Sequence, residues 1–279
     1  MSAPPPVNEF EFLRGMPFGP YMPVNSPVHR LDPRARILLV TLLVAALTIA
    51  RHPLGMIIGF AAILVCWRVA RVPFEPLLRG WRAALPFLLI LALLQVVLRA
   101  GGRNEPPWFT IGPLVVSAAD VWSGASLLAR FFSLMAVLGL AAAVMSESEL
   151  THGLEALLKP LAFLRVPVSD FVTIIQVMLR YFPLLAQSAE RIAKAQASRG
   201  ADWRPSGWNL VHRVRQVTPL IVPLFVTSLR RAESMALAMD ARGYGSARQR
   251  TSLVVLRYSR RDLLAGLLGV LLAAAIVAL

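Results

Sequence analysis

The sequence predicts an all-α integral membrane protein with about five transmembrane helices, plus long amphipathic cytoplasmic helices between the fourth and the last span. Apolar residues make up 57% of the 279 residues and charged residues only 16%, whereas soluble proteins are about a quarter charged. The mean hydropathy of +0.63 points the same way. The net charge of +14 is expected in cytoplasmic loops, facing anionic lipids or an acidic partner protein rather than nucleic acid.

Five charge-free apolar runs locate the membrane spans. Four lie in the membrane region 37–146, at residues 37–50, 53–67, 83–98 and 131–146, and the last lies in the final helix, 262–279. A helix needs about 20 residues to cross a bilayer, and each run is shorter than this. Flanking arginines can lengthen a span because their side chains reach the headgroups. Residues 1–36 hold many prolines and no apolar signal-peptide core, so we expect an uncleaved, flexible cytoplasmic arm.

Local signals place the starts of the first and fourth membrane helices. Asp32 is a predicted N-cap, and Pro33 suits the first helical turn. The fourth helix is expected to begin near Ala118. It then contains Asp120 and Arg130, which are either structural charges or part of a transport relay.

Arginine counts predict the orientation of the chain. The loop 68–82 holds four arginines and the loop 99–113 holds two, which places the former loop and the N-terminus in the cytoplasm. The segment 147–261 is then cytoplasmic, and it holds 17 Lys and Arg against 8 Asp and Glu. Its apolar stretches 171–185 and 220–229 are each followed by an Ala-rich helical stretch, which predicts amphipathic helices in or under the membrane interface.

Two local signals divide this segment. Ser146 and Glu149 form a capping-box pattern that opens one helix, around 150–164. Pro160 and Pro167 then interrupt the chain, and a second helix is expected to start near Val168.

An internal repeat at an offset of 43 residues marks the ends of two of these helices. Ala189-Glu190 and Arg199-Gly200 fall on Ala232-Glu233 and Arg242-Gly243. The glycine is a typical left-handed helix stop, so the arginine before it projects from the helix end. A single such arginine is commonly a charge that complements the helix dipole or faces lipid headgroups. Two copies in phase favour docking onto two equivalent acidic pockets of a dimeric partner.

These stretches resemble the transmembrane T component of energy-coupling factor (ECF) transporters, the EcfT/CbiQ family, over residues 26–279. The family signature is a pair of Ala-Arg-Gly triplets. Ala241-Arg242-Gly243 matches it in full, and Ser198-Arg199-Gly200 has serine where alanine is typical. The other matching stretches are 26–34, 149–161, 180–185, 189–197 and 231–240, together with 244–245.

The resemblance implies a non-catalytic subunit of an ABC importer in the cell membrane. Two cytosolic ABC-type ATPases would receive the two triplets, and the coupling helices would support a separate substrate-binding S component that delivers a vitamin or metal ion. The residues expected to support these helices are Arg180, Pro183, Glu190 and Glu233. No cofactor or metal is expected in this chain. No G-x-x-x-x-G-K-[ST] phosphate loop occurs in the sequence, so ATP would be hydrolysed by another subunit.

Two other function classes fit a membrane protein of this composition. An ABC permease would contain its own substrate path, and a self-sufficient secondary transporter would need polar residues or broken helices at mid-membrane. A membrane enzyme is less favoured, because no nucleophile, metal site or acid–base group stands out. The cargo, and whether one or several S components are served, are not encoded in this chain.

Overall fold

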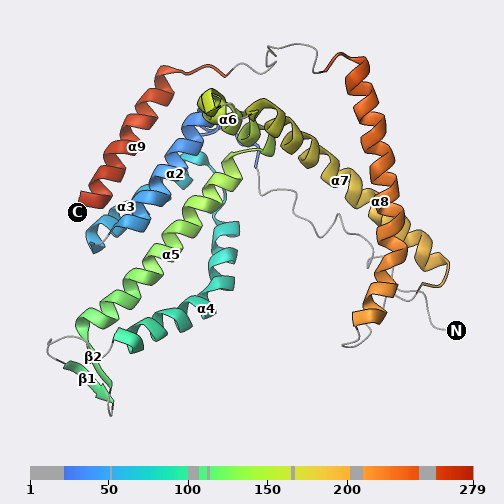
Figure 1. Cartoon of the computed structure of the whole chain (residues 1–279). Coiled ribbons are helices and arrows are strands. Elements are labelled where there is room, and N and C mark those ends of the chain that lie inside the picture. The colour runs from blue at the N-terminus through green and yellow to red at the C-terminus, as the bar shows by residue number, and fades with distance from the viewer. Residues whose placement is uncertain are drawn as a thin grey trace. The chain divides into compact units, whose positions relative to one another are not determined.

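The fold is built from helices, as predicted, with one small hairpin between two of them (Figure 1). The computed structural model describes residues 22–50, 52–99, 107–111, 114–164, 167–201, 210–244 and 256–278. Most of the predicted N-terminal arm, residues 1–21, lies outside them. In chain order the elements are α2 Pro33–Ile49, α3 Pro53–Ala70, α4 Glu75–Arg99, β1 Pro107–Ile111, β2 Leu114–Ser117, α5 Ala118–Val144, α6 Glu147–Leu158, the 3₁₀ helix η2 Lys159–Leu164, α7 Val168–Ser198, α8 Leu210–Ala241 and α9 Arg260–Ala278.

The chain divides into two compact units. We call Gly19–Val166 with Leu256–Leu279 the bundle unit, and Met1–Phe18 with Pro167–Val255 the two-helix unit. In the bundle unit, α5 contacts α2, α3 and α4, and α9 contacts α2 and α3. In the two-helix unit α7 contacts α8. Of the segment 147–261, α6 and η2 therefore fold with the bundle, and α7 and α8 form their own unit.

Four helices in the described part of the chain are long and apolar enough to cross a membrane: α4, α5, α7 and α9. Three of them carry predicted spans. Of the two other predicted spans, one lies on α3, where Leu54–Ala70 is a shorter apolar stretch, and the other lies on α2, which has only 17 residues. The fourth long apolar helix, α7, belongs to the segment for which the sequence predicts interfacial helices.

The predicted helix starts are confirmed. The Asp32 carboxylate accepts a hydrogen bond from the Arg34 backbone N–H at 2.9 Å, and α5 begins at Ala118. Ser146 and Glu149 form the expected reciprocal capping box at the start of α6, each bond being 3.2 Å long. These starts depend on residues within three positions of one another, which is why the sequence reveals them.

The connection between the third and fourth predicted spans contains a strand that was not predicted from the sequence. Pro107–Ile111 forms a strand that pairs antiparallel with Leu114–Ser117. The available signal was a run of aromatic and β-branched residues on both sides of Gly112-Pro113, a turn-forming pair.

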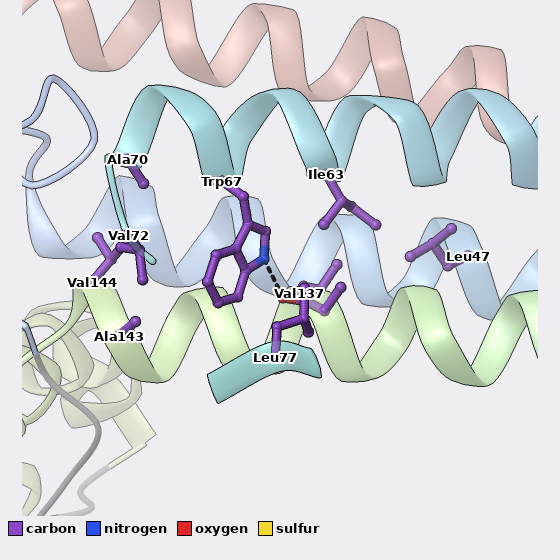
Figure 2. Packing of buried hydrophobic residues seen from close by; sticks show 10 residues of the cluster. Leu47, Ile63, Trp67, Ala70, Val72, Leu77, Val137, Ala143 and Val144 are labelled. Atoms are coloured by element: carbon purple, nitrogen blue, oxygen red, sulfur yellow. Dashed lines mark hydrogen bonds between the residues drawn. The ribbon is translucent and has the colours of Figure 1, made fainter. Parts of the chain in front are cut away.

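The core of the bundle unit surrounds Trp67, which is only 2% exposed (Figure 2). Its indole N–H donates to the carbonyl of Ala136 on α5 at 3.0 Å, and its ring stacks on Phe74 at 5.7 Å between centroids. Small residues allow the helices to approach closely. A Cβ at Gly59 of α3 would lie 2.7 Å from a methyl group of Leu47 on α2. This close packing of small residues is typical of membrane helices.

Asp120 and Arg130, the two charged residues of the fourth predicted membrane helix, bind helix ends. The Asp120 carboxylate accepts from the backbone N–H of Ser117 at 3.0 Å and from its hydroxyl at 2.8 Å, at the start of α5. The Arg130 guanidinium donates to the carbonyl of Ala50, which caps α2, at 2.6 Å. These contacts favour the structural interpretation of Asp120 and Arg130 over a transport relay.

Candidate functional site

The two repeated triplets end α7 and α8 in the same backbone geometry. At the end of α7, the Gly200 N–H donates to the carbonyl of Ala197 and the Ala201 N–H donates to that of Gln196, at 3.0 and 3.1 Å. At the end of α8, Gly243 donates to Asp240 and Tyr244 donates to Met239, at 2.8 and 2.9 Å. This pair of bonds defines a Schellman motif.

The motif explains why each triplet ends in glycine. Gly200 has φ of +85° and Gly243 has φ of +70°, a left-handed conformation that disfavours residues with a Cβ atom. Arg199 and Arg242 therefore occupy the same C-cap position on the two helices. The spacing of 43 residues is thus a structural repeat as well as a sequence repeat.

Both arginines are exposed. Within the described ranges, no hydrogen bond or ion pair engages either guanidinium group. Ser198, which replaces the usual alanine, donates its hydroxyl to the carbonyl of Lys194 at 2.8 Å. It therefore adds no free donor beside Arg199, and Ala241 is the matching small residue beside Arg242. Each of these helix ends therefore presents an exposed arginine that has no partner among the described residues.

The triplets lie at different ends of the two-helix unit. Tyr244, just beyond the second triplet, lines the same cavity as Asp170 in the first turn of α7. Arg199 lies at the opposite end of α7, whose 31 residues span about 46 Å. Figure 1 shows α7 and α8 crossing with their last turns apart. The structure does not bring Arg199 and Arg242 together, so one small pocket cannot hold both.

The four predicted support residues have unequal surroundings. Glu190 accepts from Lys194 at 2.6 Å, one turn later on α7. Its repeat equivalent, Glu233, is exposed on α8. Pro183 lies inside α7, where the missing N–H leaves one helical carbonyl unbonded. Arg180 lines a cavity between α7 and α8.

A buried polar cluster in the bundle unit was not anticipated from the sequence. Arg36 on α2 is 4% exposed and donates to the carbonyls of Leu31 and Val144, both at 2.9 Å. It also donates to the Glu149 carboxylate, with both bonds at 3.1 Å. An arginine inside the first helix next to a long apolar run was the available signal, because a buried charge requires a partner.

A separate pair of hydrogen bonds joins the residue before α2 to the start of α9. The Asp262 carboxylate at the start of α9 accepts from the Asp32 N–H at 2.7 Å and from the Ser259 N–H at 2.7 Å. Burial raises the pKa of Glu149, but hydrogen bonds from Arg36 and Ser146 and the charge of Arg36 outweigh burial and lower that pKa below its ordinary value. The Arg36 cluster thus links α2 to α5 and α6, and the Asp262 carboxylate links the start of α2 to α9.

Comparison with known proteins agrees with this architecture. The family described as cobalt transport protein, CbiQ, matches residues 24–253. The chain belongs to the CbiQ/EcfT family. Curated relatives named energy-coupling factor transporter transmembrane protein EcfT include one from Listeria innocua, 34% identical over 90% of this chain and 92% of the relative. Another, from Bacillus subtilis, is 33% identical over 90% of this chain and 92% of the relative.

The match covers both units of this EcfT-like chain. A relative from Acidaminococcus fermentans with the same name is 35% identical over 91% of this chain and 93% of its own length. The relatives are named as transmembrane components of a transporter, and the apolar helices here have the length and composition of a multi-pass membrane protein. This membership confirms the family predicted from the triplets.

Proposed function

We propose that this chain is the scaffold and coupling component of an ECF-type importer. It would pass the ATP-driven movement of two cytosolic ABC-type ATPases to a separate substrate-binding membrane subunit, without catalysing a reaction itself. The observation that carries this proposal is the pair of identical helix ends, each presenting one exposed arginine. Two equivalent tips match two equivalent ATPase subunits.

Each arginine would anchor one ATPase. A guanidinium group forms charge-assisted bonds to carboxylates or to helix-end carbonyls. The length of α7 separates the tips, so each can enter its own subunit. When ATP binding moves the ATPases, α7 and α8 would move with them as rigid levers, because both are continuous helices of 31 and 32 residues.

An exposed apolar face of α8 would contact the substrate-binding subunit. Val222, Phe225 and Leu229 recur at three- and four-residue spacing on one side of this helix, and they are 54%, 64% and 50% exposed. Such a face requires lipid or another apolar protein surface. Movement of α8 would then be transmitted directly to the subunit that holds the cargo.

The proposed cargo is a vitamin or a metal ion, and the description of the family as cobalt transport protein supports a metal ion. The two-helix unit would face the cytoplasm. The positive charge of the segment 147–261 supports this orientation through the positive-inside rule.

Co-purification of the complex tests the anchor assignment. Arg199→Ala combined with Arg242→Ala is expected to abolish co-purification of the ATPases while the chain stays in the membrane. Loss of such interface charges costs on the order of 2–5 kcal/mol each, or a factor of roughly 30 to several thousand in affinity. The matched control is Arg68→Ala with Arg82→Ala, two exposed arginines of the bundle unit, which should leave the complex intact.

Two results would contradict the proposal. An intact complex with full uptake in the Arg199/Arg242 double variant would remove the anchor role. ATP-driven uptake by this chain and the ATPases alone, without a further membrane subunit, would instead favour a permease that contains its own substrate path.

A further inference from the structure

Three arginines converge on one groove between α7 and α8. Arg180 from α7 and Arg230 and Arg231 from α8 line a cavity of about 610 Å³. None of the described lining residues is acidic. Along the described ranges, none of the three guanidinium groups has an ion-pair partner. An anion bound in this groove would lie among three positive charges with no described acidic residue in the lining, so the groove favours an anion.

The three arginines are the charged donors for such an anion, and the Tyr181 side chain also lines the cavity. Two hydroxyl groups in the same cavity are already used: Thr227 donates to the carbonyl of Pro223 at 2.7 Å, and Ser234 donates to that of Arg230 at 2.9 Å. Arginine forms paired bonds with the oxygens of phosphate and carboxylate groups. The polar half of the groove is therefore built for one of these two groups.

A second cavity, of about 580 Å³, continues from the first. The two share Tyr181, Arg231 and Met235. Beyond these residues the lining is mainly apolar, and it includes Ile174 and Met178, which are 64% and 60% exposed. The acidic residue of this cavity, Asp170, does not line the arginine cavity. The groove thus has a cationic end joined to an apolar end, and both volumes lie in the range of small-molecule sites.

We propose that this groove binds an anionic phospholipid, with the phosphate on Arg180, Arg230 and Arg231 and an acyl chain in the apolar cavity. An acidic peptide would neutralise the arginines, but it would not account for the apolar cavity that continues from them. The helix that carries Arg180 is long and apolar enough to enter a membrane, where anionic lipids are at hand. The lipid would fill the angle between the two helices, so its presence would stiffen their crossing. This inference is independent of the ATPase anchors.

Native mass spectrometry of the purified full-length chain tests this site, with phosphatidylglycerol and phosphatidylcholine as probes. The wild-type chain should retain one phosphatidylglycerol in preference to phosphatidylcholine. The triple variant Arg180→Gln, Arg230→Gln, Arg231→Gln should bind that lipid about a hundredfold more weakly, because the loss of each arginine lowers the affinity about fivefold and the three factors multiply. The matched control Arg68→Gln, Arg79→Gln, Arg82→Gln removes the same charge from exposed arginines of the bundle unit and should keep the preference.

A second variant tests the apolar half without changing any charge. Ala232 lines the apolar cavity, and Ala232→Phe should fill it and weaken phosphatidylglycerol binding by about tenfold. Equal lipid retention by the wild-type chain and both groove variants would overturn the proposal. The proposal would also be overturned if the bundle control lost as much phosphatidylglycerol binding as the triple variant. If the triple variant keeps the lipid but loses a protein subunit from the purified complex, the arginines bind an acidic protein segment instead, and the proposal is wrong.

Discussion

Arg36→Met should destabilise the bundle unit far more than the loss of an ordinary surface arginine. Methionine keeps an apolar stem but leaves the carbonyls of Leu31 and Val144 and the carboxylate of Glu149 without their donor. Breaking a fully buried pair costs about 3–5 kcal/mol. The Glu149 side chain is 35% exposed and is partly solvated, so we expect about 2–3 kcal/mol. Thermal unfolding in detergent should show a Tm lower by about 5–10 °C.

A second Arg–Glu pair in the same unit provides the control. Arg79 donates to Glu75 at 2.8 Å, a shorter contact than that of Arg36, but both side chains are 79% exposed. Arg79→Met should therefore leave Tm almost unchanged. Adding Glu149→Gln to Arg36→Met should recover part of the loss, because the unpaired charge is removed. Equal Tm values for Arg36→Met and Arg79→Met would refute the idea that burial makes the difference.

Three further outcomes are expected. Gly55→Ala should lower the free energy of unfolding by about 1–3 kcal/mol, and Tm with it, because a Cβ there collides with the backbone carbonyl of Ile276. Gly266→Ala has open space around it and should leave Tm equal or slightly raised. Gly200→Ala should weaken ATPase binding in a pull-down without changing the Tm of the bundle unit. The reason is that a Cβ at φ of +85° costs about 1–2 kcal/mol and distorts only that helix end. A lowered Tm of the bundle unit would contradict this expectation. The pKa of Glu149 is lowered in the folded chain, so its carboxylate adds stability at pH values above the unfolded-state pKa of about 4.3, and this stability is lost as pH falls through the folded-state pKa. Tm should therefore fall more steeply on acidification in the wild type than in Glu149→Gln. Parallel curves of Tm against pH would contradict this expectation.

The sequence was sufficient where a feature depends on neighbouring residues. The capping box of Ser146 and Glu149 closes over three residues, and the helix ends at Gly200 and Gly243 close over five. Such bonds form whenever the local residues allow them, so capping and stop signals predicted them. The hairpin before α5 is also local, and its signal is the aromatic and β-branched residues on both sides of Gly112-Pro113.

Only the tertiary structure decided which distant groups meet. Arg36 and Glu149 are 113 residues apart, and Asp32 and Asp262 are 230 apart. Arg180 shares its groove with Arg230 and Arg231 because of where α7 crosses α8. Hydropathy and helical periodicity give the direction of one apolar face, but they do not specify which helix packs on it or at what height. Those choices depend on how side chains from several helices fill the same space, and no single stretch of sequence contains that information.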